Sequence, residues 1–166
     1  NAVLMKQYTL PELDKFLAWI KHQPIQMRFI ELMETGEMDD FFKTQHLSGQ
    51  SILQRLLQEG WTLQPKSLSD GPAKVLSHPD YLGEIGLIMP YEKSFCASCN
   101  RLRVSATGKL HLCLFGEEGV DIRDLLQSDE QKLQLEMRLK SALQGKREHH
   151  YLHIGDSGIR NTLASI

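Results

Sequence analysis

The sequence predicts a mixed α/β protein that passes into an α+β region, and three observations support this fold class. A strand, a helix and a second strand follow one another within residues 1–33. Short apolar segments separated by Gly, Pro, Asp and Ser fill residues 61–89, a pattern typical of antiparallel strands. A long final helix is expected at residues 129–144. The chain has 166 residues, of which 41% are hydrophobic, so it can bury a core of its own.

The first segment reads as a βαβ unit. Residues 1–5 are an apolar run of strand type, and Thr9 and Glu12 have the spacing of a capping box for a helix that reaches Ile20. Residues 25–33 supply the second strand. Strands joined by a helical crossover are normally parallel, and a parallel sheet needs cover on both faces.

One βαβ unit cannot form such a sheet alone. We therefore predict that residues 1–36 are the end of a larger α/β array, and that residues 37–166 form a C-terminal domain. Within that domain Asp39 and Asp40 are expected in a loop, and residues 51–58 in a helix.

The final helix has the clearest boundaries. Ser128 and Gln131 have the spacing of a capping box, and Gly145 stands where a helix ends. The apolar residues of this helix are expected to pack in the core, and they are Leu133, Leu135, Met137, Leu139 and Leu143.

Charge and composition exclude two classes of partner. The net charge of −2 provides no broad basic surface for nucleic acid. No apolar run approaches the roughly 20 residues that cross a bilayer, and no signal peptide is seen. The three cysteines are an odd number and all lie within residues 96–113, which favours metal-binding thiolates in a reducing, cytoplasmic setting over a disulfide framework.

The cysteines form the candidate metal site. Cys96 and Cys99 stand three positions apart, so both can reach one metal centre. Cys113 follows on the far strand of a hairpin expected at residues 101–114, with its turn at Gly108. A four-iron cluster usually takes four cysteines, so three would leave one iron open for a substrate. The spacing equally allows structural zinc on three cysteines and His111.

Two arginines accompany the cysteines. Arg101 and Arg103 would point to one face of a strand, where guanidinium forks suit phosphate or carboxylate groups. The alternative is that both are solvated residues on an exposed strand.

These segments resemble the GTP 3′,8-cyclase family of radical S-adenosylmethionine (SAM) enzymes, which act in molybdenum cofactor biosynthesis. The resemblance extends over essentially the whole chain. It is most specific at residues 28–36, which begin RFIELM, and at residues 95–115, which begin FCASCNRLR and end in CLF.

The resemblance implies an incomplete βα barrel, of which this chain holds the last βαβ unit. It implies a lyase that uses a SAM-derived radical to convert GTP to (8S)-3′,8-cyclo-7,8-dihydroguanosine triphosphate, the precursor of molybdopterin. It also implies SAM and two four-iron, four-sulfur (4Fe–4S) clusters in the full-length enzyme. The partners it implies are GTP, the N-terminal half, a second copy in a homodimer, and the next enzyme of the pterin pathway.

Residue roles follow from the same resemblance. The substrate-side cluster would be held by Cys96, Cys99 and Cys113. GTP would be bound by Arg101, Leu102, Arg103 and Arg28, and SAM would be contacted by Met33. No residue of this chain is assigned a catalytic role.

One departure limits what this chain does by itself. The family's N-terminal motif of three cysteines is absent, so the chain is expected to be inactive alone. The family usually ends in Gly-Gly, whereas this sequence stops at Ile166, so the chain is expected to be cut at both ends or proteolysed. The competing readings are an auxiliary-cluster domain that relays electrons in another radical-SAM enzyme, and a zinc-stabilised binding module.

The strand at residues 25–33 poses a geometric problem. In a regular strand Arg28 shares a face with Ile30 and Leu32, while Glu31 and Met33 face the other way. Arg28 and Met33 therefore cannot both point inward without an irregularity in the strand. Glu31 is a candidate for orienting Arg28.

Overall fold

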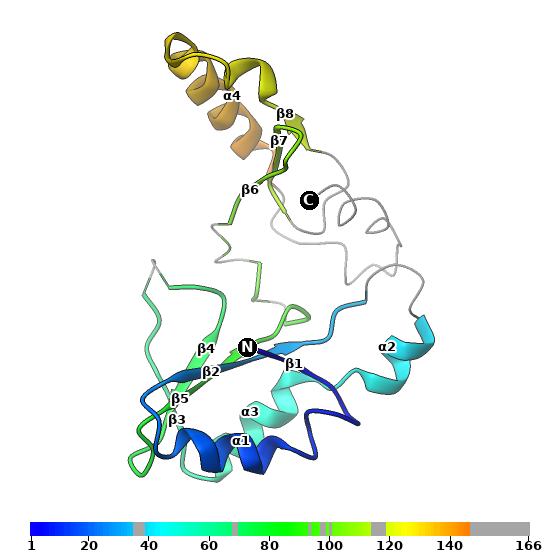
Figure 1. Ribbon diagram of the computed structural model, residues 1–166, viewed down its shortest axis with the longest axis vertical. Coiled ribbons are helices and arrows are strands. Elements are labelled where there is room, and N and C mark those ends of the chain that lie inside the picture. The colour runs from blue at the N-terminus through cyan, green and yellow to red at the C-terminus, as the bar shows by residue number, and fades with distance from the viewer. Residues whose placement is uncertain are drawn as a thin grey trace. The chain divides into compact units, whose positions relative to one another are not determined.

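The chain forms two compact units in a computed structural model that describes residues 1–34, 39–67, 70–92, 94–96, 99, 101–113 and 119–146. Unit 1 comprises the described residues from 1 to 96, and unit 2 those from 99 to 146. Figure 1 shows the elements of each unit along the chain. The predicted mixed α/β class is confirmed. The functional division at residue 36 stays a prediction.

Unit 1 is built on a mixed five-stranded sheet with the strand order β1-β2-β5-β4-β3. Its strands are β1 (Ala2–Leu4), β2 (Gln26–Glu31), β3 (Thr62–Leu63), β4 (Lys74–Ser77) and β5 (Glu84–Ile88). The predicted parallel pairing of β1 with β2 is confirmed, with Ala2 opposite Phe29.

Strand β5 corrects the prediction that residues 61–89 pair only in antiparallel fashion. It is antiparallel to β4 but parallel to β2, with Gln26 opposite Glu84. Its residues 85–87 are all buried, in keeping with the position of β5 in the middle of the sheet. The βαβ unit and the later strands therefore form one sheet.

Gly83 directly precedes β5 and allows close packing between the start of this strand and the end of the first helix. A Cβ atom there would lie 2.7–2.8 Å from three carbonyl oxygens, those of Ile20, Gln23 and Ile25. The Gly83 N–H donates to the carbonyl of Ile20 at 3.0 Å. The end of the first helix can therefore meet the start of β5 only because this residue has no side chain.

The first helix begins later than predicted. Helix α1 (Leu13–Ile20) has no side-chain cap, so the capping box expected at Thr9 and Glu12 is wrong. The physical reason is that the Thr9 hydroxyl donates instead to the carbonyl of Val3 in β1.

Two helices follow β2. The loop expected at Asp39 and Asp40 is wrong, because these residues begin helix α2 (Asp39–Gln45). Helix α3 (Gly49–Gln58) contains the predicted segment and starts two residues earlier, because the Ser48 hydroxyl accepts a hydrogen bond from the Gln50 N–H.

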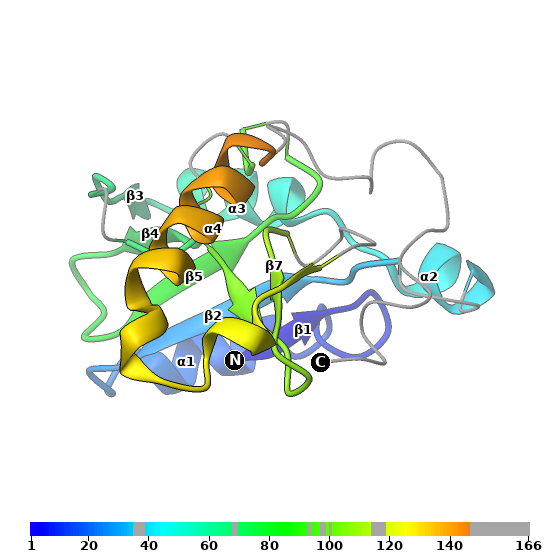
Figure 2. The same ribbon diagram turned by 90° about the horizontal axis from the view of Figure 1, so that it is seen from above.

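The core of unit 1 lies between the sheet and helices α1 and α3. Both helices lie on the same side of the sheet in the two ribbon views (Figures 1 and 2). Alternation along β2 turns Met27, Phe29 and Glu31 into the buried face, while Arg28 is exposed on the opposite face. The largest side chains buried with them include Leu13, Ile20, Leu56, Leu76, Ile85 and Leu87.

Unit 2 contains the predicted hairpin, extended by a third strand. Strands β6 (Arg103–Val104), β7 (Lys109–His111) and β8 (Val120–Asp121) form an antiparallel sheet in that order. Gly108 lies in the hairpin turn with φ +79°, a conformation that favours glycine. Strand β8 was not predicted, since its two residues are too few to show a periodicity.

The last helix caps as predicted. Ser128 and Gln131 form both hydrogen bonds of the capping box at the turn η2 (Asp129–Gln131). This turn leads into helix α4 (Lys132–Gln144), whose C-cap is Gly145. A second short turn, η1 (Arg123–Leu125), precedes it.

The expectation that the apolar residues of α4 pack in a core is wrong for Leu133, which is 68% exposed, and for Met137 and Leu143, which are also exposed. The buried apolar residues of unit 2 within the described part are only Leu110, Ile122 and Leu125. Arg138 attaches α4 to β8 by donating to the carbonyl of Asp121 at 3.0 Å. None of the described helices combines the length and apolar character that crossing a membrane requires.

Candidate metal and nucleotide site

The three cysteines are divided between the two units. Cys96 lies in a turn at the end of unit 1, whereas Cys99 and Cys113 belong to unit 2, and all three cysteines are partly exposed. Among the residues that the structure describes, no three His, Cys, Asp or Glu side chains are grouped so as to hold a metal ion. The assignment of a cluster to these cysteines therefore stays a prediction.

His111 is the most unusual side chain of the hairpin. The residue is only 4% exposed, and neither ring nitrogen has a hydrogen-bond partner among the residues that the structure describes. A buried polar group without a partner costs about 1–3 kcal/mol. Such a group two residues before Cys113 fits a site that a bound metal group would complete.

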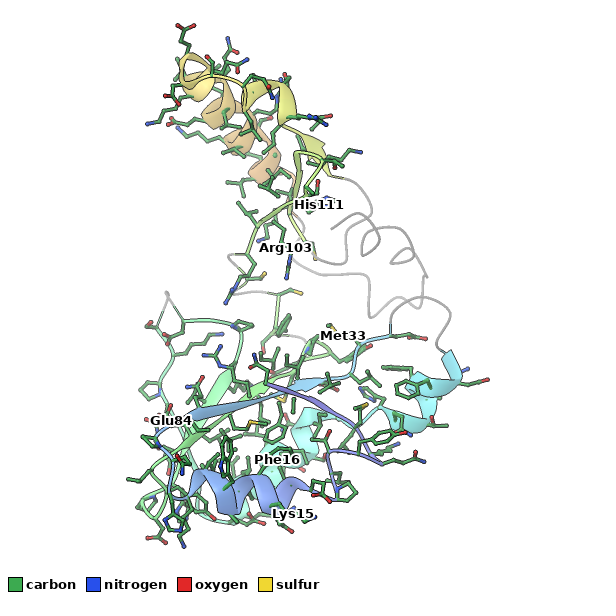
Figure 3. The ribbon with its side chains drawn as sticks, in the orientation of Figure 1. Lys15, Phe16, Met33, Glu84, Arg103 and His111 are labelled. Atoms are coloured by element: carbon green, nitrogen blue, oxygen red, sulfur yellow. The ribbon has the colours of Figure 1, made fainter. Side chains whose placement is uncertain are left out.

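The two arginines are not placed alike. β6 begins at Arg103, which lies directly opposite His111, as Figure 3 shows for their neighbouring strands. Arg101 precedes the strand and is exposed, and Leu102 is exposed as well. The prediction that both arginines belong to one regular strand is therefore wrong. The predicted role of Arg101, Leu102 and Arg103 in GTP binding does not depend on that strand, and it stays a prediction.

Lys146 is a residue that the sequence did not single out. Its Nζ donates to the carbonyl oxygens of Cys99 at 2.8 Å and Arg101 at 3.2 Å. The contact connects the end of α4 to the second cysteine and the first arginine. Only a lysine placed directly after the Gly145 cap could have pointed to it, and that signal is weak.

Met33 follows β2 in unit 1 (Figure 3). The next residue, Glu34, donates its N–H to the Tyr91 hydroxyl at 2.8 Å. Burial raises the pKa of this tyrosine, which keeps the hydroxyl neutral as a hydrogen-bond partner. The segment that carries Met33 is thereby held at its C-terminal side.

The same segment is held at its N-terminal side by a hydrogen bond between a buried carboxyl group and a histidine. Glu31 is 3% exposed, and its Oε1 lies 2.9 Å from Nε2 of His46. Burial raises the pKa of Glu31, while His46 and the Gly49 N–H act in the opposite direction. The suggestion that Glu31 orients Arg28 is wrong, because the two side chains lie on opposite faces of β2.

Arg28 instead crosses the open face of the sheet. The absent Cβ of Gly86 leaves room for it, since a Cβ there would be 2.9 Å from Arg28 Cγ. Its Nε donates to the Gln26 side-chain oxygen at 2.6 Å, and Gln26 in turn donates to Glu84 at 2.9 Å. These contacts agree with the alternation deduced from the sequence.

The fold and the candidate site define a mixed α/β protein in which three cysteines and two arginines lie within one segment, residues 96–113, and comparison with known proteins identifies its family. Residues 25–152 match the family described as Molybdenum Cofactor Synthesis C. The chain belongs to this family. The family resemblance inferred from the sequence is thereby confirmed.

Three relatives illustrate the similarity. The chain is 86% identical over 166 residues to the GTP 3′,8-cyclase of Actinobacillus pleuropneumoniae serotype 5b (strain L20). It is 85% identical to the GTP 3′,8-cyclase of Haemophilus ducreyi (strain 35000HP / ATCC 700724), and 72% identical to that of Haemophilus influenzae (strain 86-028NP), over the same length. In each case all of this chain is covered but only 49% of the relative. The chain thus spans about half the length of these relatives.

Proposed function

We propose that this chain is the C-terminal, substrate-binding part of a GTP 3′,8-cyclase. The observation that carries the proposal is the 86% identity over the whole chain to proteins of that name. The full-length protein would convert GTP to (8S)-3′,8-cyclo-7,8-dihydroguanosine triphosphate, in the cytoplasm. The N-terminal half would supply the radical chemistry, so this chain alone would be inactive.

A 4Fe–4S cluster on Cys96, Cys99 and Cys113 would serve the substrate side of the reaction. With three protein ligands, such a cluster supplies one iron that can take a substrate atom. The partly exposed cysteines support this assignment, as does the His111 ring, whose nitrogens have no hydrogen-bond partner within the described part of the chain. The protein's part is to present the sulfurs, to shield the site from water and to place the nucleotide beside it.

Arg101, Leu102 and Arg103 would hold GTP next to that iron. The exposed guanidinium of Arg101 and the partly exposed one of Arg103 are available to phosphate oxygens. Arg28 would add a further contact from the open face of the sheet in unit 1. Met33 would contact SAM, with its segment fixed by Tyr91 on one side and Glu31 on the other.

The parallel strands β1, β2 and β5 fit the end of an incomplete barrel, whose remaining strands would come from the N-terminal half. A second cluster, SAM, a homodimer partner and the next enzyme of the pterin pathway would complete the assembly. All of these components would belong to, or bind, the full-length protein.

GTP affinity tests the proposal. We would measure GTP binding to the anaerobically prepared, iron-loaded chain, and to its Arg101→Ala, Arg103→Ala double variant. Two lost contacts to charged groups predict about a 100-fold weaker affinity. Arg123→Ala removes one exposed arginine of the same unit and serves as control, with an expected change of less than about threefold. An unaltered affinity in the double variant would show that the triphosphate assignment is wrong.

One observation keeps a second candidate open. His111, two residues before Cys113, is buried and has no hydrogen-bond partner among the described residues, and this also fits a Cys3His zinc site in a binding module. Iron and zinc analysis, with the visible absorption spectrum of an anaerobic sample, separates the two. A chain that takes up iron but does not bind GTP would instead be an electron-relaying auxiliary-cluster domain.

A further inference from the structure

Three residues lie at one level across the sheet of unit 2. Arg103 in β6 is opposite His111 in β7, and the pairing of Leu110 with Val120 brings Gly119 to the other side of His111. A Cβ atom on Gly119 would be 2.9 Å from Cε1 and 3.1 Å from Nε2 of the imidazole. The ring therefore leans over a residue that has no side chain.

Alternation along β7 separates this row from the apolar row of the same sheet. Val104, Leu110 and Val120 pair with one another at the next level, and Leu110 is 2% exposed in the core of the unit. His111 points to the other face, together with Arg103 and Lys109. The imidazole is thus on the polar face of the hairpin, yet it is almost completely buried.

No contact within the described residues uses the polarity of this ring, since both nitrogens lack a partner. A neutral imidazole has one N–H donor and one acceptor nitrogen, so the hairpin holds a donor, unused among the described residues, two positions before Cys113. A side chain needed only for packing would not require those nitrogens.

We propose that a ring N–H of His111 donates a hydrogen bond to a sulfur atom of the cluster held by Cys113. The proposal rests on the proposed function, because it requires the iron–sulfur cluster. His111 is then a cofactor-contacting residue and not a ligand, since a fourth protein ligand would close the iron that the substrate needs. Gly119 is its positioning residue, because it provides the space in which the ring lies.

We expect this hydrogen bond to change the reduction potential of the cluster. A reduced cluster carries one more negative charge than an oxidised one, so a hydrogen bond to its sulfur stabilises the reduced form. His111 therefore raises the reduction potential of the cluster, just as outer-shell hydrogen bonds adjust other metal sites. The three cysteines of this chain can hold only one cluster, so its potential is measured without interference.

The test is a redox titration of the iron-loaded chain, followed by electron paramagnetic resonance. His111→Leu removes the donor and should move the midpoint potential to more negative values. His111→Gln retains an N–H donor and should recover part of the shift. Gly119→Ala keeps the imidazole but displaces it, and should move the potential in the same direction as His111→Leu. Val104→Ala, an exposed change in the neighbouring strand, should leave the potential where it is.

A second measurement distinguishes a hydrogen bond from ligation. Labelling histidine with 15N and recording the pulsed resonance of the reduced cluster should give a weak nitrogen coupling that vanishes in His111→Leu. Strong coupling would show direct ligation and would overturn the proposal, as would potentials that agree among the wild type and all three site variants. If the wild-type chain takes up zinc and no iron, the proposed function fails, and this inference fails with it. If the cluster forms but does not respond to His111, this inference alone fails.

Discussion

Lys146 Nζ lies 2.8 Å from the carbonyl oxygen of Cys99, so the second residue after the last helix contacts a residue 47 positions earlier in the chain. The same ammonium group reaches the carbonyl oxygen of Arg101. The α4 helix therefore acts as a support for the backbone that carries the second cysteine and the first arginine.

Removing that ammonium group should loosen the segment. Lys146→Met keeps most of the stem but loses both hydrogen bonds, so tryptic cleavage after Arg101 and Arg103 should become roughly threefold to tenfold faster. Lys140→Met, on an exposed position of α4, is the matched control and should cleave at the wild-type rate. Equal rates in both variants would mean that the contact does not hold the segment.

The Tyr91 hydroxyl should protect the backbone next to Met33. Tyr91→Phe removes the acceptor of the Glu34 N–H, and a hydrogen bond of about 0.5–1.5 kcal/mol corresponds to roughly twofold to tenfold faster amide exchange at Glu34. Hydrogen–deuterium exchange measures this directly. Tyr8→Phe changes a tyrosine that is 60% exposed and should leave the exchange unaltered. Wild-type exchange at Glu34 in Tyr91→Phe would contradict the assignment.

Glu31 should make stability depend on pH. Burial raises its pKa above the ordinary 4.5, with Glu92 acting in the same direction and His46 against it. The folded state therefore holds the proton more tightly than the unfolded chain does. The stabilisation from this group is fully present below about pH 4.5, and it is lost as pH rises through the raised pKa.

Urea unfolding at several pH values tests this dependence. Between pH 4.5 and 7 the stability of Glu31→Gln should improve relative to the wild type, because glutamine does not ionise. Glu136→Gln, an exposed change in α4, should follow the wild type at every pH. A constant difference between Glu31→Gln and wild type would show that the carboxyl group does not titrate in this range.

Two adjacent leucines of α3 should differ strongly in their contribution to folding. Leu56 is 0% exposed and packs in the core of unit 1, whereas Leu57 is 47% exposed. Leu56→Ala should lower the free energy of unfolding by about 2–5 kcal/mol, and Leu57→Ala by less than about 1 kcal/mol. Denaturant unfolding followed by circular dichroism gives both values. Similar losses would mean that α3 is not seated as described.

Local signals in the sequence predicted the local structure well. The Ser128 capping box and the Gly108 turn depend on residues a few positions apart, and the structure contains both. The capping box at Thr9 failed because a strand carbonyl, that of Val3, competes for the same hydroxyl. The exposed leucines of α4 show the converse, since an apolar pattern cannot reveal how little core a small unit offers.

Contacts between residues far apart in the chain could not be predicted from the sequence. Nothing within residues 84–88 shows that they pair with β2, because that choice depends on a partner strand more than 50 residues earlier. The motif identified the cysteines and arginines of the candidate site, but not the support from Lys146 or Tyr91. His111 was noticed only as a zinc ligand, since its burial and the space over Gly119 emerge from the folded hairpin.

The absence of a side chain at Gly83 affects the solubility of the protein. Any side chain there pushes against three carbonyl oxygens, so the fifth strand cannot settle between its two neighbours. Strand β2 would then offer an unsatisfied row of amides and carbonyls to other molecules. A change at this glycine would first be seen as insolubility, before any question of catalysis arises.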